Sequence, residues 1–273
     1  MPRVRQHSPW SWFIQGASLT VLACLSARSL AEDATSDPSK VSTPFTDAAT
    51  GIKMERFFGE RTTFGFGLAM PTVPNNSFIG QLSFPLVNGA GWGALGLTGD
   101  MENNFFLATW ADGNGGVMAS FRQGTDEDNP PEVKGNFAVR TISDATSVNS
   151  TFLTHTFLCE GCLDAALGLG ADATGADAVM GWALSAKSVG SPTTAGGRLG
   201  FHEQGFGPFT MRLGQAKFAE FDTWAALANS SIPGSANAIP VSLNVATNGG
   251  DGDNSGDEDE GDDENGDDSD DDD

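Results

Sequence analysis

The sequence predicts an all-β protein, folded as an antiparallel β-sandwich with one short helix near its carboxyl end. Two observations carry this prediction. The 273 residues include 35 Gly and 13 Pro, a composition that argues against a mostly helical chain. Between residues 52 and 228, short apolar runs are separated at regular intervals by Gly, Asn, Asp and Pro. Strands of roughly 5–8 residues with such punctuation are typical of a sandwich.

Eight segments have the composition of strands. Segment 178–186 shows the clearest alternation, because Met180, Trp182 and Leu184 share one face of an extended chain. Segment 105–110 has no polar face, which favours a central strand. The eight predicted strands are 61–68, 77–86, 105–110, 116–122, 136–141, 150–158, 178–186 and 198–202.

One helix is predicted over residues 214–228. Phe218, Phe221, Trp224 and Ala225 recur at i, i+3, i+6 and i+7, which places them in a single apolar stripe on one helix face.

The amino end has the features of a secretory signal peptide over residues 1–31. Arg3 and Arg5 precede a short apolar stretch, and Ser29-Leu30-Ala31 has the small-x-small pattern of a cleavage site. The stretch is short for a membrane span, and no later segment reaches the roughly 18 apolar residues that a span needs. We therefore expect a secreted, extracellular protein without a membrane span.

The remaining chain divides by composition into four parts. Residues 32–51 are predicted as a loose lead-in, 52–230 as one sandwich domain, 231–247 as a linker and 248–273 as a disordered acidic tail. Because the tail has no apolar residue, it has nothing to bury that would offset its ordering entropy.

The charge of the chain is strongly negative and concentrated in that tail. The net charge is −22, and residues 251–273 contain 15 of the 36 Asp and Glu residues. This balance excludes a nucleic-acid binder, which needs a basic footprint. The run from Asp251 to Asp257 resembles the start of an EF-hand loop, but its twelfth position is Asp262 and no helices flank it. Weak, diffuse binding of divalent cations is the better interpretation.

Two cysteines, Cys159 and Cys162, remain after signal removal, and in an oxidising compartment they are expected to form a disulfide. A thioredoxin-type pair would need a following helix, and zinc would need further ligands nearby. Covalent haem attachment would need His where Leu163 stands. Three Asn-x-Ser/Thr sequons predict glycosylation at Asn75, Asn149 and Asn229.

Few residues after the signal peptide can act as metal ligands. His155 lies among apolar neighbours in a predicted strand, and its ordinary interpretation is packing. His202 lies at a strand end flanked by glycines, a setting more suggestive of ligand binding. Met101 lies at a loop-to-strand junction, where methionine most often fills core space.

A series of short motifs, taken in order and spacing, resembles the haem-binding cytochrome domain of fungal cellobiose dehydrogenase. The resemblance covers roughly residues 45–230. The motifs are Phe78-Ile79-Gly80-Gln81-Leu82, Gly91-Trp92-Gly93, Gly99-Asp100-Met101, Ala108-Thr109-Trp110, Ser120-Phe121-Arg122, Asn149-Ser150-Thr151, Phe157-Leu158-Cys159-Glu160-Gly161-Cys162, Gly181-Trp182-Ala183, and Phe201-His202 with Gly207-Pro208-Phe209.

The resemblance implies an immunoglobulin-like β-sandwich of the DOMON type that binds haem b through one Met and one His. By position these ligands are Met101 and His202, and the family's paired cysteines form a disulfide. The chain has no Tyr, so Arg, Trp or backbone groups would have to bond the haem propionates. The cofactor-binding residues predicted beside the ligands are Trp92, Phe105 and Arg122. As candidate pocket walls we consider Trp92, Phe105, Phe106 and Trp110, with core packing as the alternative for each.

A Met/His pair leaves no open position on the iron, which favours outer-sphere electron transfer over oxygen chemistry. The resemblance implies a flavin dehydrogenase as electron donor, and a copper polysaccharide monooxygenase or ferric iron as acceptor. No flavin domain follows in this sequence, so the sugar-oxidising activity is not carried over, and the chain is more an electron-transfer haemoprotein than an enzyme by itself. The alternatives are a haem-free carbohydrate-binding sandwich, and a decayed domain whose acidic tail binds cations or surfaces.

Overall fold

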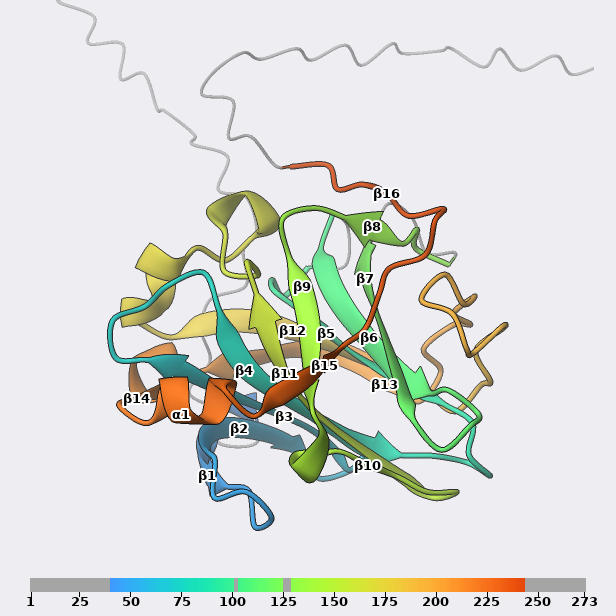
Figure 1. The fold of residues 1–273 in the computed structure, drawn as a ribbon, viewed down its shortest axis with the longest axis horizontal. Helices are drawn as coiled ribbons and strands as arrows, with labels where there is room; N and C mark the ends of the chain where they lie inside the picture. Colours follow the sequence, from blue (N-terminus) through green and yellow to red (C-terminus); the bar gives the residue numbers. More distant parts are fainter. Residues whose placement is uncertain (1–39, 101–102, 125–128, 244–273) are drawn as a thin grey trace, which may run out of the picture. The chain divides into compact units, whose positions relative to one another are not determined.

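The computed structural model describes residues 40–100, 103–124 and 129–243. In this part of the chain two antiparallel sheets pack face to face, which confirms the predicted β-sandwich (Figure 1). The predicted tail and signal peptide, and Met101, lie outside the described residues.

The larger sheet has nine strands and runs in the order β1-β2-β3-β4-β11-β9-β15. Strand β10 pairs with β11, and β14 pairs in parallel with β3. The strands are β1 (Thr43–Thr46), β2 (Lys53–Gly59), β3 (Phe64–Pro71), β4 (Phe78–Pro85), β9 (Ala138–Ile142), β10 (Ser147–Val148), β11 (Phe152–Glu160), β14 (Lys217–Phe218) and β15 (Ala228–Ser231).

The smaller sheet has five strands in the order β13-β12-β5-β6-β7. Its strands are β5 (Trp92–Gly96), β6 (Phe105–Ala111), β7 (Val117–Gln123), β12 (Ala178–Ser185) and β13 (Gly205–Met211). A separate two-stranded parallel pair joins β8 (Val133–Lys134) to β16 (Ile239–Pro240).

The helical elements are short. Within residues 41–243 as described, the α-helix is α1 (Phe221–Ala225), and 3-10 helices span Ser143–Ala145, Ala165–Leu167, Ala171–Gly175 and Leu213–Gln215. The predicted apolar stripe does pack together, because Phe218, Phe221, Trp224 and Ala225 all join one cluster on the outer face of β2, β3 and β4. The helix is shorter than the predicted 214–228, since Lys217–Phe218 pair with β3 as a strand.

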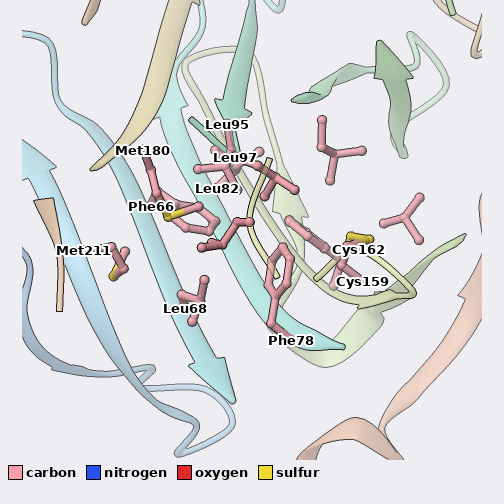
Figure 2. Close-up of a cluster of buried hydrophobic side chains, with 14 of the residues drawn as sticks. Phe66, Leu68, Phe78, Leu82, Leu95, Leu97, Cys159, Cys162, Met180 and Met211 are labelled. Carbon is pink, nitrogen blue, oxygen red and sulfur yellow. A yellow bond between two sulfur atoms is a disulfide. The ribbon is translucent and has the colours of Figure 1, made fainter. Parts of the chain in front are cut away.

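The main core lies between the two sheets and follows the period of two along each strand. Phe66 and Leu68 enter it from β3, Leu82 from β4, Leu95 from β5 and Met180 from β12. Figure 2 shows side chains from both sheets meeting in this layer, with the Cys159–Cys162 disulfide near Phe78. The disulfide, predicted from the sequence, is confirmed, with the two Cα atoms 5.7 Å apart.

The structure differs from the predicted elements in several further places. Strands β2 and β5 lie within the predicted domain but outside the eight predicted strand segments. Residues 198–202, predicted as a strand, form a loop, and the strand follows at Gly205–Met211. Gly205 and Gly207 both have positive φ and lie beside the Trp182 ring. A Cβ on Gly205 would stand only 2.9 Å from that ring, whereas a Cβ on Gly207 would make an ordinary contact at 3.7 Å. Thr43–Thr46 in the predicted lead-in form β1. Residues 231–243 of the predicted linker fold back onto the sandwich.

Candidate functional site

A pocket lies on the outer face of the five-stranded sheet, and its floor is almost free of side chains. Ala94 and Gly96 of β5 and Gly181 and Ala183 of β12 line it, and they are the outward positions of two paired strands. The hollow has about 780 Å³ of empty space, including its open mouth. Such a flat, apolar floor accommodates a planar ring system at close range.

The other walls of the pocket come from strand ends and loops. Phe106 and Trp92 supply aromatic surface from the sheet, and Asp100, Asn104, Asn129 and Pro130 also line the pocket. The remaining wall comes from Leu199, Gly200, Phe201, His202, Phe206 and Gly207, in the segment that carries His202.

His202 lies at the rim, between two exposed aromatic rings. The Phe201 ring centroid is 4.4 Å from the imidazole, and the Phe206 centroid is 4.5 Å from it. Phe201 is 52% exposed and Phe206 58% exposed. His202 Nδ1 is buried and has no hydrogen-bond partner among the described residues. An unpaired buried nitrogen is costly unless a ligand satisfies it.

The chain around His202 is held by polar contacts. Glu203 accepts hydrogen bonds from Ser185 Oγ and Ala186 N, both at 2.8 Å. Burial alone raises the pKa of Glu203, but these hydrogen bonds outweigh it and lower that pKa. The charged carboxylate thus fixes the turn that follows His202.

Two tryptophans that face each other across β5 and β6 differ in their hydrogen bonding. Trp92 and Trp110 are register partners in one apolar cluster. Trp110 Nε1 donates to Pro192 O at 2.8 Å, and Trp110 is not among the pocket-lining residues. Trp92 lines the pocket, is 4% exposed, and its Nε1 has no partner among the described residues. The pocket therefore has one unused donor in an apolar wall.

Two of the residues predicted to bind a cofactor lie outside this pocket. Phe105 faces the inter-sheet core and stacks on Phe121 at 5.4 Å, because its neighbour Phe106 takes the outward position of β6. Arg122 faces outward but is only 2% exposed, since loops cover it. Its guanidinium donates to Pro130 O, Ala195 O and Gly197 O, so its donors are used within the protein. Burial lowers the pKa of Arg122 to about 10.

The prediction for Met101 lies outside the described residues. The described residues on either side do reach the pocket, because Asp100 and Asn104 both line it. Asn104 Nδ2 donates to Thr98 O at 3.0 Å and to Asp100 O at 2.7 Å. This buried amide holds the chain that leads to Met101 against the pocket.

His155 lies on the other side of the five-stranded sheet, fully buried between the sheets. Its Nδ1 is 3.0 Å from Thr109 Oγ1 of β6, and its Nε2 is 3.1 Å from Thr141 Oγ1 of β9. Thr109 already donates its hydroxyl proton to Met118 O. Nδ1 must therefore carry the imidazole proton, and Nε2 accepts from Thr141. Burial lowers the pKa of His155 to about 3, which keeps the ring neutral.

Sequence reasoning missed several pocket residues. The floor residues Ala94, Gly96, Gly181 and Ala183 are small and carry no chemical signature, and only the outward register of two paired strands identifies them. The three predicted glycosylation sites, Asn75, Asn149 and Asn229, are all exposed, on strands or loops of the nine-stranded sheet.

A β-sandwich with an apolar pocket on one outer face, and an unpaired imidazole nitrogen at its rim, defines a cofactor-binding domain. The family model of the cytochrome domain of cellobiose dehydrogenase matches residues 45–223, and the chain belongs to that family. Membership supports a haem cofactor and a role in electron transfer.

Solved structures agree with this assignment. The cytochrome domain of Myriococcum thermophilum cellobiose dehydrogenase is 27% identical, with a TM-score of 0.64 over 71% of this chain and 99% of that one. The cytochrome b domain of pyranose dehydrogenase from Coprinopsis cinerea is 25% identical, with a TM-score of 0.62 over 74% of this chain and 99% of that one.

A curated relative is the pyrroloquinoline quinone-dependent pyranose dehydrogenase of Coprinopsis cinerea, 30% identical over 146 residues. The match covers 52% of this chain and 19% of the relative, so the chain spans about a fifth of that protein. Among the described residues, no helix is long and apolar enough to cross a membrane.

Proposed function

We propose that this chain is a secreted, extracellular b-type cytochrome that transfers single electrons through a haem held by His202 and Met101. The observation that carries the proposal is the coincidence of a flat, apolar floor with two buried, unpaired nitrogens in one pocket. His202 Nδ1 and Trp92 Nε1 are two of only three such side-chain nitrogens among the described residues.

The residues of the pocket fit a haem in three respects. Ala94, Gly96, Gly181 and Ala183 leave space for a planar macrocycle on the sheet. His202 supplies an imidazole at the rim, and Trp92 supplies a hydrogen-bond donor to a carboxylate, in a chain that has no Tyr. Bound haem would supply a one-electron redox couple, and a Met ligand raises its potential relative to a second nitrogen ligand.

Each part of the protein has a separate task in this proposal. The sheet excludes water from the floor, and the Glu203 carboxylate fixes the chain beside His202. Phe201 and Phe206 are exposed at the mouth, so electrons pass through a small apolar surface. Redox proteins often meet through interfaces of that small, transient kind.

The proposed partners are extracellular redox proteins. The donor is a dehydrogenase that contains flavin or, as the name of the curated relative suggests, pyrroloquinoline quinone. The acceptor is a copper polysaccharide monooxygenase or ferric iron, in the oxidation of lignocellulose or other carbohydrate. Glycans at Asn75, Asn149 and Asn229 would decorate the nine-stranded sheet and leave the pocket free for these partners.

The test is to express the chain from Glu32 with haem available and record absorption spectra in both oxidation states. We expect a low-spin spectrum with sharp α and β bands on reduction. His202→Ala and Met101→Ala should each lose that low-spin signature, because each removes one of the two side chains that would hold the haem iron. His155→Ala is the matched control and should keep it, since His155 is bonded to two threonines between the sheets. A colourless wild-type protein, or loss of ligation only in His155→Ala, would refute the assignment.

One observation favours a second function, the binding of carbohydrate. Phe201 and Phe206 present exposed rings on either side of His202, and such rings can stack on sugar faces. Retention of a colourless protein on insoluble polysaccharide, lost in Phe201→Ala, would support this function in place of the first.

A further inference from the structure

The last described segment, residues 232–243, crosses back over the sandwich, and we name it the C-terminal strap. It lies beyond residues 45–223, which match the family model. Ile232 N donates to Val139 O of the nine-stranded sheet, and Val241 N donates to Lys134 O of β8. Near its end, Ser242 and the Gln123 side chain exchange two hydrogen bonds of 2.9 Å. The strap thus reaches from the larger sheet to β7 of the smaller sheet.

The middle of the strap meets a buried carboxylate. Glu132 is 8% exposed and accepts hydrogen bonds from both the backbone N–H and the hydroxyl of Ser235. Ile239 N also donates to Glu132 O at 3.0 Å. The charge of Glu132 raises the pKa of Arg122, against the larger effect of burial. The strap is therefore joined to a buried pair of opposite charges.

That pair adjoins the loop that carries His202. Arg122 Nη2 donates to Ala195 O at 2.8 Å and to Gly197 O at 2.6 Å. Gly196 between them lies directly against the strap, because a Cβ there would be 3.2 Å from Ser235 Oγ and 3.3 Å from Glu132 Oε2. The side chains of Ser235, Glu132 and Arg122 thus meet the backbone of residues 195–197, in the middle of the loop between β12 and β13.

The bracing continues along the loop to the pocket. Arg198 forms a two-hydrogen-bond bridge with Gly190. Leu199 N then donates to Asn129 Oδ1 at 2.9 Å, and both residues line the pocket. His202 follows three residues after Leu199, so little chain separates the braced part from the imidazole.

We propose that the C-terminal strap, through Ser235 and Glu132, positions the loop that carries His202 over the pocket. Ser235, Glu132 and Arg122 are positioning residues in this view and do not touch the cofactor. The proposal rests on the proposed function for its consequence, which is the retention of haem, but the bracing itself requires no cofactor.

The test compares two serine–glutamate pairs in the same protein, each with a buried glutamate. Ser235→Ala weakens the strap, and the control Ser42→Ala weakens a similar cluster in which Ser42 Oγ donates to Glu55 and accepts from Arg212 N. Neither Ser42 nor Glu55 lines the pocket. The first readout is hydrogen–deuterium exchange of residues 190–204 in protein without haem. We expect exchange about tenfold faster in Ser235→Ala and unchanged in Ser42→Ala, on the scale of one lost hydrogen bond to a charged group.

The second readout is the rate at which haem passes from the loaded protein to excess apomyoglobin. Ser235→Ala should lose haem about tenfold faster than wild type, and Ser42→Ala at the wild-type rate. Glu132→Gln should resemble Ser235→Ala, because it removes the charge beside Arg122. Equal exchange in residues 190–204 for the two serine variants would overturn the proposal. Failure of wild type to take up haem would refute the proposed function while leaving the exchange result decisive for the strap.

Discussion

The two described histidines lie on opposite sides of one sheet, and their surroundings differ in almost every respect. His155 is fully buried between the sheets, and threonines satisfy both of its ring nitrogens. His202 lies outside the five-stranded sheet at the rim of a pocket, with Nδ1 unpaired. A buried polar group that is satisfied stabilises a fold, whereas one that is left unpaired beside a pocket is a candidate for contact with a ligand.

The largest effect is expected from filling the pocket beside His202. Ala183 lies on the floor and is partly exposed, so Ala183→Phe would occupy the space of a planar ligand without entering the core between the sheets. We expect haem affinity to fall at least about a hundredfold, the scale of a steric clash in a packed site. Haem titration monitored by absorbance measures the change.

Ala138→Phe is the control for that substitution, because Ala138 is exposed on β9 of the other sheet. Its affinity should equal that of wild type. Normal haem uptake by Ala183→Phe would mean that the floor does not form the binding surface.

The next effect is a loss of stability when His155, the histidine between the sheets, is replaced. His155→Leu removes two hydrogen bonds that join β11 to β6 and to β9, and leaves the Thr141 hydroxyl without its acceptor. We expect the free energy of unfolding to fall by about 3 kcal/mol, from the lost bonds and imperfect packing. Urea unfolding measures this, and the spectrum of the loaded protein should not change. A destabilisation equal to that of His202→Leu would remove the distinction between the two histidines.

The free energy of unfolding should depend on acid pH because His155 is buried. An unfolded His titrates near pH 6.5, whereas burial lowers the pKa of His155 to about 3 in the folded protein. Below pH 6.5 the unfolded chain therefore binds a proton that the folded chain does not, and stability declines by up to about 1.4 kcal/mol per pH unit. Between pH 6.5 and 5.0 the wild type should lose about 2 kcal/mol more than His155→Leu does.

Between pH 5.0 and 6.5, the effect of His155 on stability is separated from that of the carboxylates. The pKa of Asp47 is lowered, because hydrogen bonds from Thr50 and Gln81 outweigh the effect of burial, and its stabilisation disappears only at more acidic pH. Unfolding titrations at pH 5.0, 5.5, 6.0 and 6.5 measure the effect. Parallel curves for wild type and variant would show that His155 is charged when folded.

The sequence predicted the parts of this fold that depend on strong local patterns. Alternation in β12 placed Met180 and Leu184 correctly in the core, and the close cysteine pair indicated the disulfide. The sequence could not show which residue of β6 faces outward, because Phe105 and Phe106 are both aromatic and only strand pairing decides which one faces the core. Arg122 illustrates a second limit. Three of its four partners are backbone carbonyls up to 75 residues away, and a carbonyl is the same whatever residue bears it.

The smallest expected effect separates the two tryptophans that pair across β5 and β6. Trp92→Phe keeps the aromatic wall of the pocket but removes the unpaired N–H. If that N–H donates to bound haem, haem affinity should fall about fivefold, the scale of one ordinary net hydrogen bond. Trp110→Phe removes an N–H that already donates to Pro192 O. It should lower the free energy of unfolding by about 1 kcal/mol and leave affinity unchanged. In haem titrations only Trp92→Phe should lose affinity, and in urea unfolding Trp110→Phe should lose stability. A loss of haem affinity in Trp110→Phe alone would mean that Trp110, and not Trp92, supplies the N–H donor.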